Sequence, residues 1–251
     1  MLPLSIVILT RNEAKNIVRC LQALQGLSDD VLIVDNGSTD DTMALARSLG
    51  ARVIQVEWQG YSATKNTGNL QAKYDWILSL DADEVMDGRL KEAIQKRFQT
   101  LPSPEHAFLI RRKMVYGEQI LHHGSVSKEY RLRIFDRRRA CWNTNTVHED
   151  VEFSGDVKRE TLEGVVLHYS FADSKDHLER LDKYARLSAQ HMHEQGRKPH
   201  ILKHCFSPLF GFVKDYIFRL GFLDGKAGYH FAKEEMWYRR RKYDLLKAMK
   251  A

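Results

Sequence analysis

Cysteine is scarce in this sequence, and no long hydrophobic run stands near its start. The 251 residues include only three cysteines, which lie far apart and in no spacing typical of a metal site. An odd and scattered set argues against a disulfide framework and indicates a reducing compartment. The apolar run at residues 4–9 is too short for the hydrophobic region of a signal peptide, and no basic segment precedes it. We therefore expect a cytoplasmic protein.

Two common phosphate-binding and metal-binding loops are also missing. Residues 10–13 follow the first predicted strand without a glycine, which argues against P-loop and dinucleotide-binding enzymes. A sugar nucleotidyltransferase would need a glycine-rich, arginine-containing loop at the same place. Asp81 and Asp83 begin like an EF-hand, but that loop requires a ligand and a glycine where Val85 and Met86 stand. Calcium binding of that kind is excluded.

The positive charge is concentrated at the C-terminal end. Residues 200–251 contain 11 Lys and Arg and 5 Asp and Glu, a net +6 that equals the formal charge of the whole chain. Residues 201–223 are rich in aromatic and aliphatic side chains, but charges interrupt them, so they do not form a spanning helix of ~20 uncharged residues. We expect contact with an anionic membrane surface, and the alternative is a helical lid packed on the core. No RNA-binding or DNA-binding motif is recognisable.

Short apolar runs alternate with helical patterns through the first hundred residues. Apolar runs end near residues 9, 34, 56 and 80, and between them Ile17, Val18, Leu21 and Leu24 share one helical face. This spacing is typical of βα units. The sequence therefore predicts an α/β fold with a mostly parallel sheet and helices on both faces.

The character of the chain changes after Pro102 and Pro104. Strands of mixed order are predicted at 107–111, 130–135 and 163–168, and the pattern turns helical from Ser174 onward. We expect two parts, which are a catalytic domain over residues 1–170 and a helical, basic and aromatic region over residues 171–251.

Two carboxylates one residue apart follow an apolar run of strand length. Residues 76–80 read as a buried strand, and period two points Asp81 and Asp83 the same way. Ligands of open parallel sheets bind beyond the carboxyl ends of the strands. Hard oxygens there suit a divalent ion that holds a diphosphate. A solvated strand exit would look the same.

Other strand ends supply further polar side chains to the same edge. Thr10, Asn12 and Glu13 follow the first strand, and Asp35 follows the second. Asp35 could accept a hydrogen bond from a base, or it could serve only as a turn and helix-cap residue. Lys65 and Asn66 open the third helix, where they could face a ribose or phosphate. An exposed helical lysine is the alternative.

The second half offers a base and a further metal ligand. Glu149 follows an aromatic residue and a histidine, and a positioned carboxylate can activate an acceptor hydroxyl. A surface acidic turn is the alternative. His168 ends an apolar run, either as a metal ligand or as a strand-end residue without a ligand.

Together these residues resemble the inverting glycosyltransferases of family 2, which have the GT-A fold. The matching segments in the first half are residues 6–13, 34–40, 65–68 and 80–84. Those in the second half are residues 131–135, 147–149, 168–170 and 221–225, and they resemble the branch containing lipopolysaccharide core β-1,4-glucosyltransferases that act on inner-core heptose.

The resemblance implies a role for each matching residue. Residues implied to bind the donor are Thr10, Asn12, Glu13, Asp35, Lys65, Asn66, Asp81, Arg131 and Arg133. One of the two arginines could instead be a structural ion-pair partner. The implied metal ligands are Asp83, His168 and, if it does not contact the ribose, Asp81. Glu149 is the implied base, and Asp150 is the second candidate because the wider fold often uses the second acid of such a pair.

The implied reaction moves a hexose, with glucose expected, from a UDP-sugar to inner-core heptose of lipopolysaccharide. It requires a divalent metal, Mg²⁺ or Mn²⁺, and a lipid-linked saccharide acceptor at the inner face of the cytoplasmic membrane. No nucleic acid partner is expected. The alternatives left open are another glycan, lipid or peptide acceptor, a sugar nucleotidyltransferase, and a sugar-nucleotide-binding module without catalysis.

Overall fold

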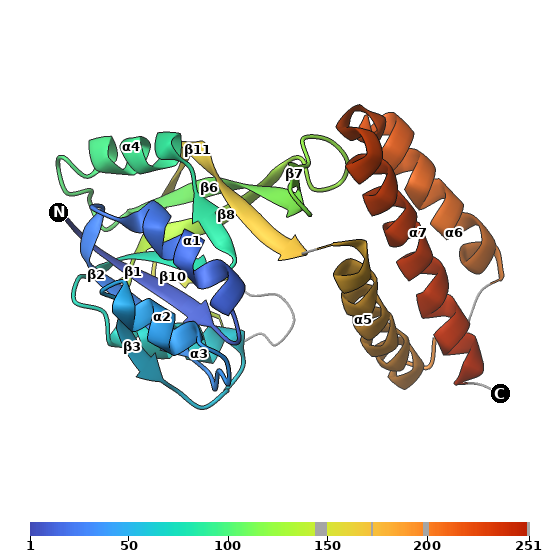
Figure 1. The fold of residues 1–251 in the computed structure, drawn as a ribbon, viewed down its shortest axis with the longest axis horizontal. Helices are drawn as coiled ribbons and strands as arrows, with labels where there is room; N and C mark the ends of the chain where they lie inside the picture. Colours follow the sequence, from blue (N-terminus) through green and yellow to red (C-terminus); the bar gives the residue numbers. More distant parts are fainter. Residues whose placement is uncertain (144–149, 172, 198–200, 250–251) are drawn as a thin grey trace. The chain divides into compact units, whose positions relative to one another are not determined.

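A computed structural model describes residues 1–143, 150–171, 173–197 and 201–249 (Figure 1). The chain forms two compact units. The first comprises Met1–Arg112 and Glu129–His168, and the second comprises Lys113–Lys128 and Tyr169–Ala251. The predicted α/β class is confirmed in the first unit. No helix in the described ranges is long and apolar enough to cross a bilayer.

Within the described residues, nine strands join one sheet in the order β3-β2-β1-β4-β8-β6-β11-β5, and β7 pairs with β6. A separate two-stranded ribbon pairs β9 with β10. The strands are β1 (Leu2–Thr10), β2 (Ser28–Asp35), β3 (Arg52–Gln55), β4 (Trp76–Asp81), β5 (Glu84–Met86), β6 (His106–Tyr116), β7 (Gln119–Ile120), β8 (Glu129–Asp136), β9 (Ala140–Trp142), β10 (Val151–Phe153) and β11 (Lys158–Phe171).

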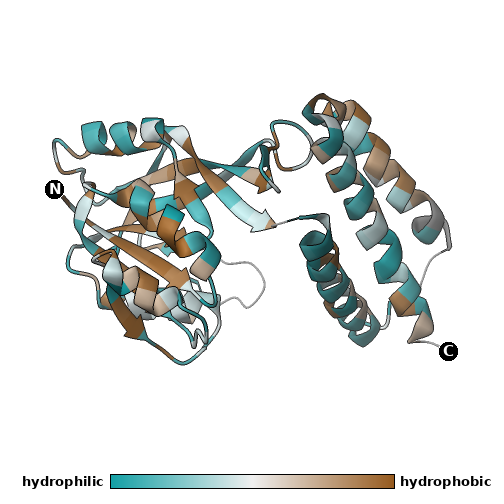
Figure 2. Ribbon diagram, in the orientation of Figure 1, coloured by the Kyte–Doolittle hydropathy of each residue, from teal (hydrophilic) through white to brown (hydrophobic). Residues whose placement is uncertain are grey.

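The parallel part of the sheet is the one that the sequence predicts. β1 pairs in parallel with β2 and β4, and β2 pairs in parallel with β3. β1 lies between two neighbours and is buried on both faces, which explains its continuous apolar run. Figure 2 shows this concentration of hydrophobic residues in the strands of the first unit.

The rest of the sheet is antiparallel, so the sheet as a whole is mixed. β8 pairs antiparallel with β4 and with β6, and β11 pairs antiparallel with β5. The strands predicted at 107–111, 130–135 and 163–168 are confirmed as parts of β6, β8 and β11. The sheet order brings β11, from late in the chain, to the turn that follows β4.

Two hydrophobic layers cover the two faces of the sheet. Leu4, Ile6 and Ile8 join one layer with the buried side chains of α1, α2 and α4, whereas Val7 and Leu9 join the other. α3 lies on the second face, where Gly68 contacts Val7 and Val34. These helices are α1 (Ala14–Leu24), α2 (Thr42–Ser48), α3 (Tyr61–Leu70) and α4 (Gly88–Arg97).

The second unit is mainly helical and includes a segment from the middle of the chain. Its helices are α5 (Ser174–Glu194), α6 (Ile201–Val213), which continues into a π-helical turn at Lys214–Phe218 and a 3₁₀ turn at Gly221–Asp224, and α7 (Gly225–Ala248). Tyr116 and Leu121 pack with Ala227 and Phe231 in its core. This packing explains why residues 113–128 fold with the C-terminal helices. The expected boundary near residue 170 lies close to Tyr169, where the longer segment of this unit begins.

Candidate active site

The carboxyl ends of neighbouring parallel strands meet at one edge of the sheet. Thr10 lies opposite Asp35, Leu9 lies opposite Asp81, and Asp35 lies opposite Gln55. The strand-end residues that the sequence singles out are therefore close in space, at the edge where open parallel sheets bind ligands. The hydroxyl Oγ1 of Thr10 is buried there without a hydrogen-bond partner in the described part of the chain, which is uncommon and leaves it available to a ligand.

The loops after β1 and β2 are fastened to each other by side-chain hydrogen bonds. Oδ1 of Asp35 accepts from the backbone N–H groups of Gly37 (3.0 Å) and Ser38 (2.9 Å), Oδ2 accepts from Oγ of Ser38, and the residue is fully buried. Asn12 has a positive φ of 55°, and its Oδ1 accepts from the backbone N–H of Thr39 at 2.7 Å. Asn12 and Asp35 thus shape one loop surface.

Glu13 precedes α1 and links it to the loop before α2. Its backbone N–H donates to Oγ1 of Thr42 at 2.8 Å, and its Oε2 accepts from Nδ2 of Asn16 at 2.8 Å. Asp40 holds the same junction, since its Oδ2 accepts from the backbone N–H of Ala14 at 3.2 Å. Glu13 lies at this edge with its carboxylate partly engaged.

A charged cluster surrounds Asp81 at the end of β4. Nζ of Lys65 lies 3.2 Å from Oδ1 of Asp81, and a guanidinium nitrogen of Arg133 lies 3.0 Å from Oδ2. Arg133 also pairs with Glu84, whose Oε2 accepts from the backbone N–H of Asp81 at 3.1 Å. Glu84 is fully buried, and Lys65 and Arg133 are 4% and 5% exposed. Both oxygens of Asp81 therefore face cationic side chains.

Asp81 and Arg133 keep their charges at neutral pH. Burial works against ionisation of Asp81, but the positive charges of Lys65 and Arg133 outweigh it and hold the pKa of Asp81 well below its ordinary value. Burial also opposes the charge of Arg133, yet Glu84 and Asp81 raise the pKa of Arg133 above its ordinary value. The site therefore presents two buried cations beside the carboxylates of Asp81 and Glu84.

Asp83 lies beside His168 rather than in the Asp81 cluster. Residue His168 of β11 lies opposite Glu84 of β5, and its Nε2 is 3.2 Å from Oδ2 of Asp83. The side chains are 17% and 15% exposed, so a solvent-borne ion can reach both. A carboxylate oxygen suits Mg²⁺ or Mn²⁺, and an added imidazole nitrogen favours the transition metal Mn²⁺, when substrate phosphates complete the coordination. The described residues contain no group of three or more such ligands, so phosphate or water would supply the remaining positions.

Asn66 and Lys65 hold the segment that leads to the predicted base. Asn66 donates from Nδ2 to the carbonyl of Trp142 and accepts at Oδ1 from its N–H, both at 2.9 Å. Nζ of Lys65 lies 4.6 Å from the centre of the Trp142 ring. Glu149 lies outside the described residues. Asp150 is exposed, and its Oδ1 accepts from the backbone N–H of Val151 at 2.8 Å.

The two arginines of β8 are placed differently. Arg133 belongs to the Asp81 cluster, whereas Arg131 has a 51% exposed side chain that pairs with Glu129 at 2.6 Å. Arg112 also binds Glu129 at 2.6 Å, so this carboxylate holds two arginines. Of these two arginines, Arg133 is the one that pairs with Asp81 and Glu84 among the described residues.

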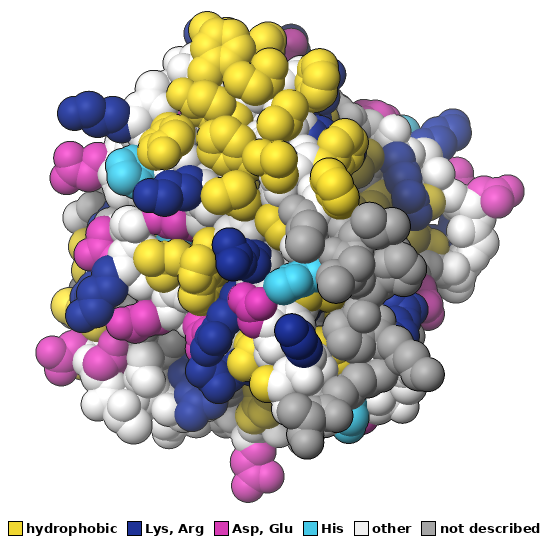
Figure 3. All heavy atoms as spheres, turned by 90° about the vertical axis from the view of Figure 1, so that its right-hand side faces the viewer, with side chains coloured by type: hydrophobic (Ala, Val, Ile, Leu, Met, Phe, Trp, Pro, Cys, Tyr) yellow, Lys and Arg dark blue, Asp and Glu magenta, His cyan; other side chains and the backbone are white. Residues whose placement is uncertain are grey.

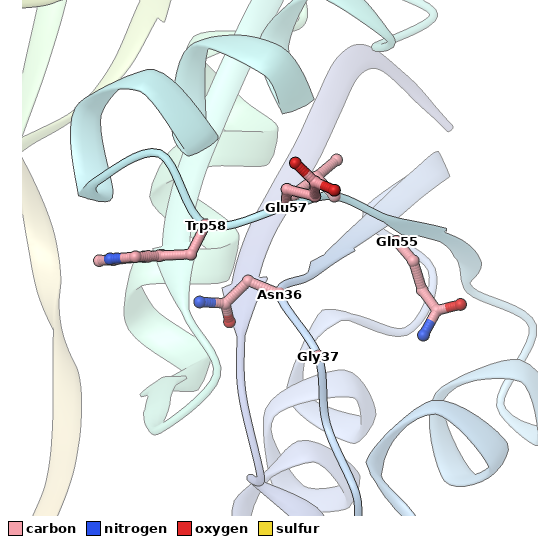
Figure 4. A pocket seen from close by; sticks show the side chains of 6 residues that line it. Asn36, Gly37, Gln55, Glu57 and Trp58 are labelled. Carbon is pink, nitrogen blue, oxygen red and sulfur yellow. The ribbon is translucent and has the colours of Figure 1, made fainter.

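A pocket of about 310 Å³ at the same edge was not predicted from the sequence (Figure 4). It is lined by Asn36, Gly37, Gln55, Val56, Glu57 and Trp58. Trp58 is 46% exposed and meets the ring of Tyr61 edge-to-face at 4.7 Å. The signal for it was a pair of aromatic residues, Trp58 between β3 and α3 and Tyr61 at the first position of α3.

Comparison with known proteins identifies the family. The model of glycosyl transferase family 2 matches residues 5–155, more than half of the chain. An uncharacterised glycosyltransferase of Rickettsia typhi is 29% identical over 234 residues, which are 90% of this chain and 80% of that protein. The lipopolysaccharide core biosynthesis glycosyltransferase LpsC of Rhizobium meliloti is 28% identical over 226 residues, with 88% and 82% covered.

Solved structures are more distant. S. aureus TarS is 18% identical with a TM-score of 0.47, over 72% of this chain and 39% of that chain. Glucosyl-3-phosphoglycerate synthase from Mycobacterium tuberculosis, in complex with Mn²⁺ and UDP, is 23% identical with a TM-score of 0.37, over 45% and 44%. This chain thus spans less than half of either solved chain. The family match over the strand-end residues is decisive, and the chain belongs to glycosyltransferase family 2 and is a glycosyltransferase.

Proposed function

We propose that the enzyme transfers a hexose, with glucose as the first candidate, from a UDP-sugar to inner-core heptose of lipopolysaccharide with inversion at the anomeric carbon. The observation that carries the proposal is the strand-end site, where Asp83 and His168 lie 3.2 Å apart beside the Asp81 cluster. The acceptor rests on the likeness to LpsC, whose name gives a role in lipopolysaccharide core biosynthesis. Another glycan, lipid or peptide acceptor is the alternative.

In this proposal the loops after β1 and β2 hold the uridine of the donor. Thr10 supplies its unpartnered hydroxyl, and Asp35 supplies the Oδ2 lone pair that remains beside the hydrogen bond from Oγ of Ser38. Asn12 and Glu13 form the adjoining wall. The pocket beside Asn36 and Trp58 gives a flat ring room next to these acceptors.

The diphosphate lies next to the charged cluster. Lys65 and Arg133 are buried cations that both pair with Asp81, Arg133 also pairs with Glu84, and a bound diphosphate would compete for the two cations. Asp83 and His168 would hold the divalent metal. Asp81 would be a third ligand once Lys65 and Arg133 pair with phosphate instead of with Asp81. The metal, when bound, neutralises negative charge that develops on the departing UDP.

The base in this proposal is Glu149, with Asp150 as the second candidate. The carboxylate takes the proton of an acceptor hydroxyl while that oxygen attacks the anomeric carbon. The new carbon–oxygen bond forms on the face opposite the bond to UDP, which breaks, so a single displacement inverts an α-linked donor to a β-linked product. Asn66 helps to fix the start of this segment through both backbone groups of Trp142.

A transfer assay with purified acceptors tests this function. The full chain is incubated with Mn²⁺, UDP-glucose or UDP-galactose, and core saccharides with or without inner-core heptose. We expect a β-linked hexose only on the heptose-containing acceptor. An α-linked product would contradict inversion, and equal transfer to acceptors without heptose would favour the alternative acceptor classes.

A further inference from the structure

An exposed apolar surface occupies α6 and the turns that follow it. Its most exposed large side chains are Phe206, Leu209, Phe210, Phe218 and Leu223, each 57–73% accessible, and we name these five the apolar patch. Figure 3 shows hydrophobic side chains gathered on this side of the second unit, with lysine and arginine side chains around them. Contiguous exposure of this kind marks a contact surface for another molecule.

The positively charged side chains around the apolar patch are exposed, and the negatively charged ones are buried. Lys214, Arg219 and Lys226 are exposed, whereas the acidic residues of the same stretch, Asp215 and Asp224, are each only 4% exposed. Asp215 pairs with Arg219 at 3.0 Å. Asp224 accepts from the backbone N–H groups of residues 122 and 123 at 3.0 and 2.8 Å. The charge presented beside the apolar patch is therefore positive.

We propose that the apolar patch inserts into the interface of an anionic bilayer, with Lys214, Arg219 and Lys226 on the lipid headgroups. Phe and Leu side chains gain free energy in the acyl boundary, and exposed lysine and arginine gain it near anionic lipid. A helix that spans the bilayer is not involved, since none of the described helices is long and apolar enough. Self-association through this surface is opposed, because it would bring like charges of two copies together.

This inference rests on the proposed function, because a lipid-linked acceptor requires the enzyme to work at a membrane. It deepens that function by assigning the membrane contact to the second unit. Donor binding and chemistry are assigned to the first unit, so each can be disabled without touching the other.

Vesicle co-sedimentation of the full chain tests the inference. We expect binding to vesicles of phosphatidylglycerol and phosphatidylcholine, and ~tenfold weaker binding to phosphatidylcholine alone, since headgroup charge contributes to such contacts. Phe210→Glu with Phe218→Glu should reduce the bound fraction by about tenfold or more, because charged side chains do not enter the acyl boundary. Lys214→Glu with Lys226→Glu should remove the preference for anionic vesicles.

The matched control is Tyr184→Glu with Leu187→Glu on α5, where both side chains are also exposed (54% and 55%) but lie outside the apolar patch. This control should bind as the wild type does. Failure of the wild type to bind anionic vesicles, or equal loss in the control, would overturn the inference. A dimer of the wild type in light scattering that the Phe210→Glu and Phe218→Glu variant loses would also overturn it, in favour of self-association.

Transfer assays separate this inference from the proposed function. The Phe210→Glu and Phe218→Glu variant should transfer sugar to a delipidated acceptor at the wild-type rate but lose transfer to the same acceptor embedded in vesicles. Equal transfer to both acceptors by this variant would overturn the membrane inference alone. Vesicle binding by a wild type that transfers to no acceptor would instead overturn the proposed function and leave the membrane contact standing.

Discussion

The imidazole Nε2 of His168 lies 3.2 Å from the carboxylate Oδ2 of Asp83, although β11 and the turn after β4 are far apart in the chain. If this pair holds the metal, Asp83→Asn and His168→Gln should each weaken metal-dependent UDP binding by roughly tenfold or more, as loss of coordination partners does. Isothermal titration calorimetry with Mn²⁺ and with EDTA measures this.

The control for this pair is Asp75→Asn. Asp75 comes just before the opposite end of β4 and pairs with Arg137, so it should bind UDP as the wild type does. Two results would exclude Asp83 and His168 as metal ligands. One is unchanged UDP affinity in both site variants, and the other is wild-type UDP affinity that does not depend on the metal.

Substitution of the proposed base should separate chemistry from binding. Glu149→Gln removes the proton acceptor and should lower transfer by ~10²- to 10⁴-fold, while UDP affinity stays near the wild-type value. Asp150→Asn should have a much smaller effect on transfer. Initial rates with the best donor and acceptor, beside UDP titrations, measure both. The reverse order of effects would assign the base to Asp150, and full turnover of both variants would exclude the pair.

Arg133 and Arg131 lie on the same strand and should differ sharply in their effect on stability. Among the described residues, Arg133→Met leaves the fully buried Glu84 with only the longer 3.6 Å pair to Arg112 and Asp81 with only Lys65, which should cost about 3 kcal/mol of unfolding free energy. Arg131→Met removes an exposed pair with Glu129 and should cost less than about 1 kcal/mol. Urea denaturation compares the two, and equal costs would show that the cluster is not a distinct stabilising feature.

Gly68 allows α3 to approach the sheet closely. A Cβ on Gly68 would lie 2.5 Å from Cγ2 of Val34 and 2.8 Å from Cγ1 of Val7, both on packed strands. Gly68→Ala should therefore destabilise the first unit by about 1–3 kcal/mol, despite the better helix propensity of alanine. Gly88→Ala in α4 meets nothing within 4 Å and should be neutral or stabilising. Thermal melts of both variants test the contrast, and a neutral Gly68→Ala would mean that the helix shifts freely.

Protonation of Glu234 should lower the unfolding free energy of the second unit at acid pH. Burial raises its pKa, but hydrogen bonds from His177, Ser174 and Tyr116 outweigh burial and lower it below the ordinary value of 4.5. A lowered folded-state pKa means that the carboxylate stabilises the fold above pH 4.5 and loses this contribution as the pH falls toward the folded-state value. Unfolding free energies between pH 3 and 7 should fall less steeply in Glu234→Gln, and parallel profiles would contradict this.

Local patterns were sufficient to predict the parallel half of the fold. β1, β2 and β4 are apolar runs that end in polar residues, and α1 shows its buried face at Ile17, Leu21 and Leu24. The insertion of β8 beside β4 could not be predicted, because antiparallel pairing between distant strands leaves no periodic signal in one sequence. Short elements such as β5 and β7 are too brief to show any period.

The candidate site was predictable in its residue types but not in its pairings. The carboxylates at 81 and 83 share a strand end, yet one faces Lys65 and Arg133 and the other faces His168. Strand periodicity alone gives both the same direction, and only the turn into β5 and the arrival of β11 separate them. The importance of Glu84, an acid fully buried beside Arg133, was invisible without the fold.

β6 and β11 each begin in the first unit and end in the second, so the chain passes between the units along two continuous strands. A single proteolytic cut in either strand would leave the units joined through the other. A truncation at residue 170 would remove Ala227 and Phe231, which pack on Tyr116 and Leu121. The hairpin formed by residues 113–128 would then expose its hydrophobic side chains. The catalytic unit is therefore better isolated by replacing residues 113–128 with a short turn than by shortening the chain alone.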